Sequence, residues 1–193
     1  MYGYTGKVLH VDLSTGDSSV EEVDEAYCRK YIGGNGLGTR LLYDHAPAGV
    51  DPLSPENPLI FAVGPLAGTT APTSGKYIVH TKSPLTGFLG EAVSSGYWGQ
   101  ALKQAGYDAI VIKGRSEKPV YLFIDDGKIQ IRDAKHLWGT DALEVLDLIR
   151  DEIGDDNVSS ASIGPGGENL VRYANITNDR HRQAGRTGVG CVM

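Results

Sequence analysis

The segment of residues 178–193, NDRHRQAGRTGVGCVM, holds the densest set of residues suited to binding chemistry. It contains three arginines and three glycines, Arg180, Arg182 and Arg186 together with Gly185, Gly188 and Gly190. The planar guanidinium groups match the oxygens of a phosphate, and the glycines can adopt positive φ and let the backbone approach a ligand. The pattern predicts an anion-binding loop. Because the chain then ends without a polar tail, we expect a domain of a longer protein.

Two other segments could contribute to the same site. Ser94, Ser95 and Gly96 stand at the expected start of a helix, where free N–H groups bind phosphate, although a simple N-cap has the same composition. Lys76 follows a Gly/Pro/Thr loop and is either a solvated lysine at a strand edge or a third cation for the anion. His181 lies among these arginines. A structural hydrogen bond explains a histidine at this position at least as well as a catalytic role does. No residue is assigned a catalytic role.

Several known motifs are missing or fail on spacing. Residues 34–38, GNGLG, lack the G-x-G-x-x-G spacing and the preceding strand of a dinucleotide site, which favours a helix-to-helix turn. Neither a P-loop nor a G-x-S-x-G nucleophile elbow occurs, so nucleotide triphosphate chemistry and serine hydrolysis have no support. The five histidines stand at positions 10, 45, 80, 136 and 181. No close spacing among them would place two on one metal.

Composition limits the class of protein. The chain has 193 residues with 18 Lys and Arg against 24 Asp and Glu, a net charge of -6, so a general nucleic-acid surface is not expected and any basic site must be local. Cys28 and Cys191 form no C-x-x-C pair, which gives no sign of a zinc or iron–sulfur site. No signal peptide or membrane span is evident. We therefore expect a cytoplasmic protein with no membrane partner.

Apolar periodicity and turn residues predict an α+β fold. Strands are expected at residues 7–13, 18–23, 59–64, 77–82, 108–113, 120–124, 128–132, 158–163 and 170–174. Helices are expected at residues 24–32, 37–45, 94–105 and 140–153, and the segment GGNG at residues 33–36 is expected to stop the first of them. Strands gather in hairpins, which favours a β-rich mixed sheet that carries the hairpin turning at 125–127, rather than a doubly wound sheet. Residues 108–153 weakly repeat the order strand, turn, strand, helix that is expected near the start of the chain, which suggests two pseudo-symmetric halves.

Four long segments together resemble one family. They are PLSPENPLIFAVGPLAGTTAPTSGKY (52–77), TKSPLTGF (81–88), AGYDAIVIKG (105–114) and SIGPGGENLVRYANITNDRHRQAGRTGVGCVM (162–193), with YGYTGKVLHVDLSTGD also in register near the start. These resemble the N-terminal domain of the tungsten-dependent aldehyde ferredoxin oxidoreductases. The resemblance extends over essentially the whole chain, residues 1–193.

The resemblance implies a cofactor site. In this family a bis-pterin tungsten or molybdenum cofactor lies on the N-terminal domain, and Mg²⁺ bridges its phosphates through backbone carbonyls. By motif position those carbonyls belong to Val93 and Gln183, while Arg182, Ala184, Gly185 and Arg186 lie along a pterin and its phosphate. Three residues depart from the family pattern: Lys76 stands where arginine is common, Val93 for asparagine and Ser95 for glycine.

The resemblance also implies an activity for the longer protein. Such an enzyme converts an aldehyde and water to a carboxylic acid and passes two electrons through a [4Fe–4S] cluster to ferredoxin. Later domains supply the cluster cysteines, which this chain lacks, so the chain by itself is expected to be inactive. A benzoyl-CoA type reductase, a glyceraldehyde-3-phosphate oxidoreductase and a stand-alone, non-catalytic binding module are the alternatives. An exposed cofactor face would also favour a homo-oligomer.

Overall fold

Alternating apolar residues build a six-stranded sheet through the middle of the molecule. The computed structural model describes residues 2–193, and its main sheet has the strand order β2-β1-β6-β3-β4-β5. The strands are β1 (Lys7–Asp12), β2 (Asp17–Glu22), β3 (Leu59–Val63), β4 (Tyr77–Lys82), β5 (Leu89–Ser94) and β6 (Ala109–Lys113). All neighbours pair antiparallel except β1 and β6, which are parallel. This mixed sheet confirms the predicted α+β class.

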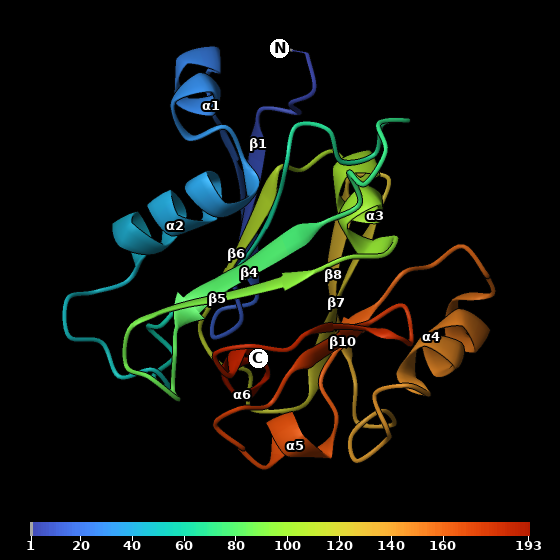
Figure 1. Ribbon diagram of the computed structural model, residues 1–193. Coiled ribbons are helices and arrows are strands. Elements are labelled where there is room, and N and C mark those ends of the chain that lie inside the picture. The colour runs from blue at the N-terminus through green and yellow to red at the C-terminus, as the bar shows by residue number, and fades with distance from the viewer. Residues whose placement is uncertain (1) are drawn as a thin grey trace.

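Two helices cover one face of the sheet. Helix α1 (Glu25–Tyr31) begins after Asp24, whose carboxylate accepts a hydrogen bond from the Tyr27 amide and so caps the helix. Helix α2 (Gly34–His45) follows, and its buried leucines pack against apolar residues of β1, β3 and β6. Figure 1 shows both helices together on one side of the sheet.

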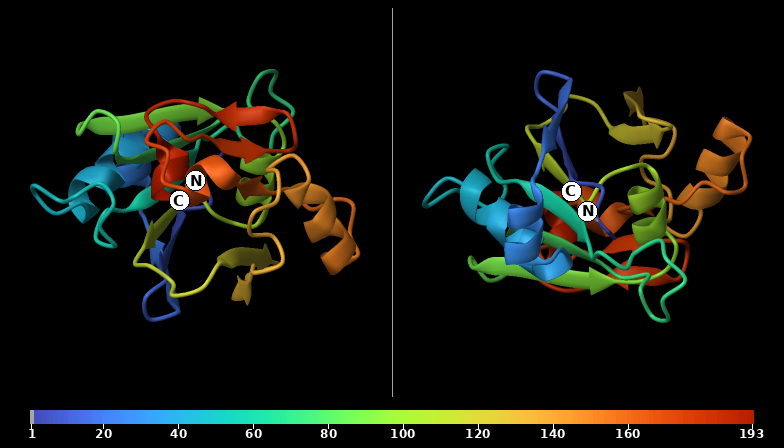
Figure 2. Two further views of the ribbon diagram at one scale, coloured as in Figure 1. Left: turned by 90° about the horizontal axis from the view of Figure 1, so that it is seen from below. Right: turned by 90° about the horizontal axis from the view of Figure 1, so that it is seen from above.

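The second half of the chain covers the opposite face. It contains α3 (Trp98–Gln104), the two-stranded sheet of β7 (Val120–Asp125) and β8 (Lys128–Asp133), α4 (Val145–Ile153), α5 (Pro165–Glu168), α6 (Val189–Val192), and a small sheet of β9 (Ala161–Ser162), β10 (Ile176–Asn178) and β11 (Arg182–Ala184). Apolar side chains of α3, β10, β11 and α6 join those of β3 and β4 in one core. In Figures 1 and 2, α4 lies on the opposite side of the molecule from α1 and α2. Because both of its faces are covered, β3 is buried at all five positions.

Close backbone packing explains where α2 begins. The first helix stops before Gly33 as predicted, but α2 starts at Gly34 and not at Leu37. A Cβ atom at Gly36 would lie 2.2 Å from the Tyr31 carbonyl oxygen, so glycine lets the start of α2 pack against the end of α1. Gly38 serves the same purpose further along, since a Cβ there would lie 2.2 Å from Nδ1 of His80 on β4. Glycines within α2 thus bring the helix close to the sheet.

Long-range contacts override the local pattern in three other places. The helix predicted for residues 94–105 begins only at Trp98, because residues 89–94 form the additional strand β5. The strand predicted at residues 170–174 is absent, and strands lie instead at 176–178 and 182–184. The hairpin turning at 125–127 does form, but in a two-stranded sheet of its own. The two pseudo-symmetric halves stay a prediction. Among residues 2–193, no helix is both long and apolar enough to cross a membrane.

Candidate functional site

The ends of β5 and β11 enclose a cavity of about 310 Å³, which we call the β5–β11 cavity. Its walls are formed by Lys76, Val93, Ser94, Ser95, Arg182 and Gln183. All six were singled out from the sequence, although they come from segments about a hundred residues apart in the chain. The two strands that meet here are edge strands, one of the six-stranded and one of the three-stranded sheet. Edge strands leave backbone carbonyls without a partner, so the cavity can offer main-chain oxygens as well as side chains.

A buried asparagine joins the strands beneath the cavity. Asn178 on β10 is 1% exposed, and its Oδ1 accepts hydrogen bonds from Tyr77 Oη at 2.9 Å and Ser94 Oγ at 2.6 Å. Its Nδ2 donates to the Ser95 carbonyl oxygen at 2.8 Å. Burial raises the pKa of Tyr77, so its hydroxyl keeps its proton and acts as a donor. Asn178 therefore holds β4, β5 and β10 in register. Sequence reasoning missed this role, because nothing in the spacing of Asn178 marks it.

At the start of α3, an internal carboxylate already bonds to two backbone amides, and anion binding there stays a prediction. Asp179 Oδ2 accepts hydrogen bonds from the amides of Tyr97 at 2.7 Å and Trp98 at 3.0 Å. Gly96 has φ 103°, and a Cβ there would lie 2.7 Å from that same oxygen. The glycine is thus needed for packing around Asp179. Ser94, the last residue of β5, and Ser95, which follows it, line the cavity ahead of the first turn of α3.

The three arginines of residues 178–193 have different surroundings. Arg180 forms an ion pair with Asp147 and is therefore already neutralised. Arg182 and Arg186 are exposed, and neither pairs with a carboxylate anywhere in residues 2–193; the same holds for Lys76. Because Lys76 and Arg182 line one cavity, two uncompensated positive charges lie together on a chain of net charge -6. This arrangement attracts an anion.

The terminal glycines and Ala184 also differ in what they do. A Cβ at Gly188 would lie 1.9 Å from the Arg172 carbonyl oxygen, and one at Gly190 would lie 2.1 Å from that of Asn175. These two glycines serve the packing of the chain on itself. At Gly185 a Cβ would meet nothing within 4 Å, so only there is the backbone open to a ligand. Ala184 is fully buried in the core, which leaves its main chain as the part available for binding.

A larger cavity of about 520 Å³ lies between β8 and α4 and is less suited to a charged ligand. It is lined by Arg132, Asp133, His136, Leu148 and Glu152. Two of its ionisable groups pair with each other, since His136 Nε2 lies 3.0 Å from Glu152 Oε2. The guanidinium of Arg132 donates two hydrogen bonds to Gln130 Oε1, at 2.9 Å and 2.6 Å. The smaller β5–β11 cavity, with its unpaired cations, is therefore the candidate site.

Comparison with known proteins connects this geometry to a family. Residues 8–193 match the family described as "Aldehyde ferredoxin oxidoreductase, N-terminal domain". The chain is 58% identical over 193 residues to a tungsten-containing aldehyde ferredoxin oxidoreductase of Pyrococcus furiosus, and 54% identical over 193 residues to one of Thermococcus kodakarensis. Each match covers 100% of this chain but only 32% of the relative, so the chain spans about a third of their length.

A solved structure has the same fold as the whole chain. It is described as "Active site complex BamBC of Benzoyl Coenzyme A reductase in complex with 1,5 Dienoyl-CoA" and superposes with a TM-score of 0.96 at 43% identity. The match covers 100% of this chain and 29% of that one.

Proposed function

The chain belongs to the aldehyde ferredoxin oxidoreductase family, and from that premise we propose that it holds the tungsten cofactor of an enzyme that oxidises aldehydes to carboxylic acids. The reaction takes an aldehyde and water to a carboxylic acid, two protons and two electrons. We assign residues 1–193 to the domain on which the cofactor lies. The parts of the enzyme that bind the substrate and transfer the electrons belong to other domains, and the assembled enzyme is cytoplasmic.

The observation that supports the proposal is the pair of uncompensated cations in the β5–β11 cavity. Lys76 and Arg182 line it without a carboxylate partner in residues 2–193, and Gly185 leaves the nearby backbone open. A bis-pterin cofactor carries phosphates that require such charges, and an arginine fork binds two phosphate oxygens at once. The cavity, of about 310 Å³, would have room for the phosphate end of such a cofactor. The residues present therefore fit the group.

Each residue of the site has a distinct task in this proposal. Arg182 and Arg186 bind a pterin phosphate, and Lys76 contributes a point charge in place of the more common arginine fork. The backbone carbonyls of Val93 and Gln183, which lie on the two edge strands, would hold the Mg²⁺ of the cofactor, because this ion prefers oxygen ligands. When bound, the tungsten or molybdenum centre supplies the two-electron redox chemistry. Asn178 would keep the wall of the cavity in place through its hydrogen bonds to Ser94 and Ser95.

The electron acceptor site lies outside this chain in the proposal. Cys28 and Cys191 are both buried and belong to different parts of the fold, so they are unsuited to be ligands of a shared cluster. The [4Fe–4S] cluster would take its cysteines from the downstream domains. Ferredoxin would then receive the electrons from that cluster.

A second candidate is the reduction of an aromatic acyl-CoA thioester. It is favoured by the solved structure of the benzoyl-CoA reductase complex, which matches this whole chain. Aldehyde oxidation is preferred because the identity to the aldehyde oxidoreductases is higher, at 58%.

The test uses the full-length protein. We expect tungsten or molybdenum and pterin to copurify with it, and aldehydes to reduce ferredoxin in its presence. Oxidation of a dienoyl-CoA without aldehyde oxidation would support the second candidate. A protein with neither metal nor pterin, expressed in cells that supply both, would contradict the proposal.

A further inference from the structure

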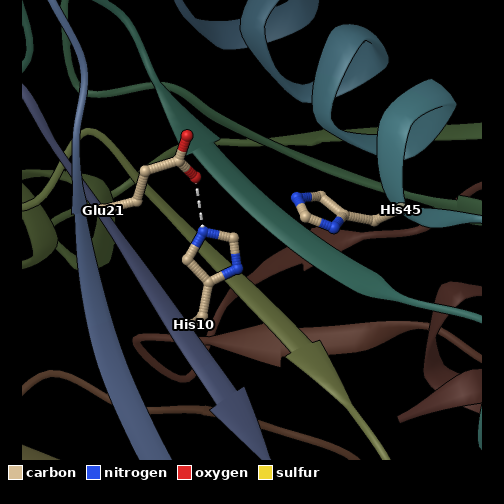
Figure 3. A group of neighbouring side chains, drawn as sticks. All are labelled: His10, Glu21 and His45. Atoms are coloured by element: carbon tan, nitrogen blue, oxygen red, sulfur yellow. Dashed lines mark hydrogen bonds and ion pairs between the residues drawn. The ribbon is translucent and has the colours of Figure 1, made fainter.

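Two histidines and a glutamate meet at a place remote from the β5–β11 cavity. His10 on β1, Glu21 on β2 and His45 at the end of α2 each offer one ligand atom, and these atoms all lie within 4.8 Å of one another. His10 Nε2 and Glu21 Oε2 are 2.8 Å apart. Figure 3 shows the His45 ring reaching from the helix toward this hydrogen-bonded pair. Spacing along the chain gave no sign of this meeting of two histidines, because tertiary contacts produce it.

Strand register and helix packing produce this meeting. In the β1–β2 hairpin, Val8 lies opposite Glu21, and His10 is two residues further along β1. Because side chains alternate along a strand, His10 and Glu21 point to the same face as Val8. That face is covered by α2, whose leucines pack against Val8. His45, the last residue of α2, is thus placed above the pair.

His45 is available as a ligand. Its ring lies edge-on to that of His10, with ring centroids 5.1 Å apart, and neither of its nitrogens has a hydrogen-bond partner in the described chain, residues 2–193. The positive charge of Lys113 opposes a cation, and the carboxylates of Glu21 and Asp44 offset it.

We propose that His10, Glu21 and His45 form a Zn²⁺ site that ties the β1–β2 hairpin to the end of α2. Zinc bonds to histidine and carboxylate are about 2.0–2.2 Å, so ligand atoms around a tetrahedral ion lie roughly 3.3 Å apart. His10 Nε2 and Glu21 Oε2 are 2.8 Å apart and no separation among the three ligand atoms exceeds 4.8 Å, so small side-chain rotations suffice. The ion replaces the hydrogen bond between His10 and Glu21. Water completes the coordination, since the Glu21 side chain is 50% exposed.

The ligand set favours zinc over the common alkaline-earth ions. Two imidazole nitrogens and one carboxylate suit Zn²⁺ and its transition-metal neighbours, whereas Mg²⁺ and Ca²⁺ require oxygen ligands. The three ligands come from three different elements, so binding restrains their relative positions. The site is therefore structural in character and independent of the proposed cofactor.

Zinc titration of the full-length protein tests the proposal. After treatment with a chelator, wild-type protein should take up one more equivalent of Zn²⁺ than His45→Gln. Loss of an outer-shell partner of a metal costs about 10- to 100-fold in affinity, so loss of a direct ligand should cost at least about 100-fold. Because His45 makes no hydrogen bond within residues 2–193, the substitution should leave the fold intact.

A second histidine–glutamate pair supplies the matched control. His136 and Glu152 lie 3.0 Å apart but have no third ligand nearby in residues 2–193, so His136→Gln should bind zinc as the wild type does. Glu21→Gln keeps a hydrogen-bonding group beside His10 and removes the anionic ligand, and it should behave as His45→Gln does. Equal zinc uptake by the wild type, His45→Gln and Glu21→Gln would overturn the proposal and leave an ordinary surface ion pair.

X-ray absorption at the zinc edge provides an independent measurement. The wild-type protein should show nitrogen and oxygen neighbours near 2.0–2.2 Å with the scattering pattern of imidazole, and this signal should be missing in His45→Gln. Sulfur neighbours near 2.3 Å, or an imidazole signal unchanged in His45→Gln, would refute the assignment.

Discussion

Replacement of Arg182 by alanine should lower the tungsten and pterin content of the full-length protein. Arg182 lines the β5–β11 cavity and pairs with no carboxylate in residues 2–193, so its guanidinium is available to a phosphate. Loss of one charge-assisted hydrogen bond costs roughly 1.5–3 kcal/mol. At 1.4 kcal/mol for each factor of ten, this corresponds to about 10- to 150-fold weaker cofactor binding.

The same substitution should scarcely affect folding. Arg182 is exposed, and its removal leaves no buried partner without a hydrogen bond. Only its aliphatic stem packs near Gly96, where an added Cβ would lie 3.2 Å from Arg182 Cγ. We expect the free energy of unfolding of the cofactor-free protein to change by about 0.5 kcal/mol or less. A loss of cofactor without a loss of stability would identify a binding role.

Metal analysis and pterin fluorescence after release of the cofactor provide the assay, and Arg180→Ala is the matched control. Arg180 belongs to the same hairpin and carries the same charge, but it is paired with Asp147. Its replacement should leave the tungsten content unchanged, while Arg182→Lys should fall between the wild type and Arg182→Ala because it keeps the charge and loses the fork. Full tungsten and pterin in the double variant Arg182→Ala, Arg186→Ala, or equal losses in Arg180→Ala, would refute the reasoning.

Three further outcomes concern stability, measured by denaturant unfolding. Asn178→Ala should destabilise the protein by about 1–3 kcal/mol for each of the two buried hydroxyls that lose their acceptor, and a change below 0.5 kcal/mol would contradict the proposed joint between strands. Gly188→Ala should strongly lower the free energy of unfolding, because Gly188 has φ 76° and a Cβ there would lie 1.9 Å from the Arg172 carbonyl oxygen. Gly185→Ala should be nearly neutral, since a Cβ there would meet nothing within 4 Å. Similar changes in the two variants would count against this distinction. Burial lowers the pKa of His80 to about 4, so stability present above the ordinary pKa of about 6.5 should be lost as the pH falls toward 4, by about 3 kcal/mol in total. His80→Gln should flatten this pH dependence, and an unchanged profile would mean that another group is responsible.

Local sequence patterns were sufficient for much of the fold. Alternation and turn residues predicted the hairpin of β1 and β2, and Asp24 caps α1 as its position suggests. The helix expected at residues 140–153 is present as α4, which begins at Val145, and the hairpin at residues 125–127 is also present. These features depend on neighbours within a few residues, and such contacts are visible in the order of the residues. The motifs of the terminal run likewise marked the family, because they are long and nearly uninterrupted.

The roles of individual site residues depend on tertiary contacts, which cannot be read from the sequence. Three arginines in one run were equivalent by spacing, yet Asp147 neutralises Arg180 and leaves Arg182 free in the cavity. Asp179 occupies the amides predicted to bind an anion.

The sequence by itself thus determined the class of fold, the family and the supply of cations. Only the tertiary structure decided which cations remain unpaired, that Asn178 joins three strands, and that His10 and His45 meet. The physical reason is that a binding site is defined by distances of a few ångströms between segments that are far apart along the chain. Those distances follow from the packing of α2 and the small sheet on opposite faces of the main sheet, and no local period encodes them.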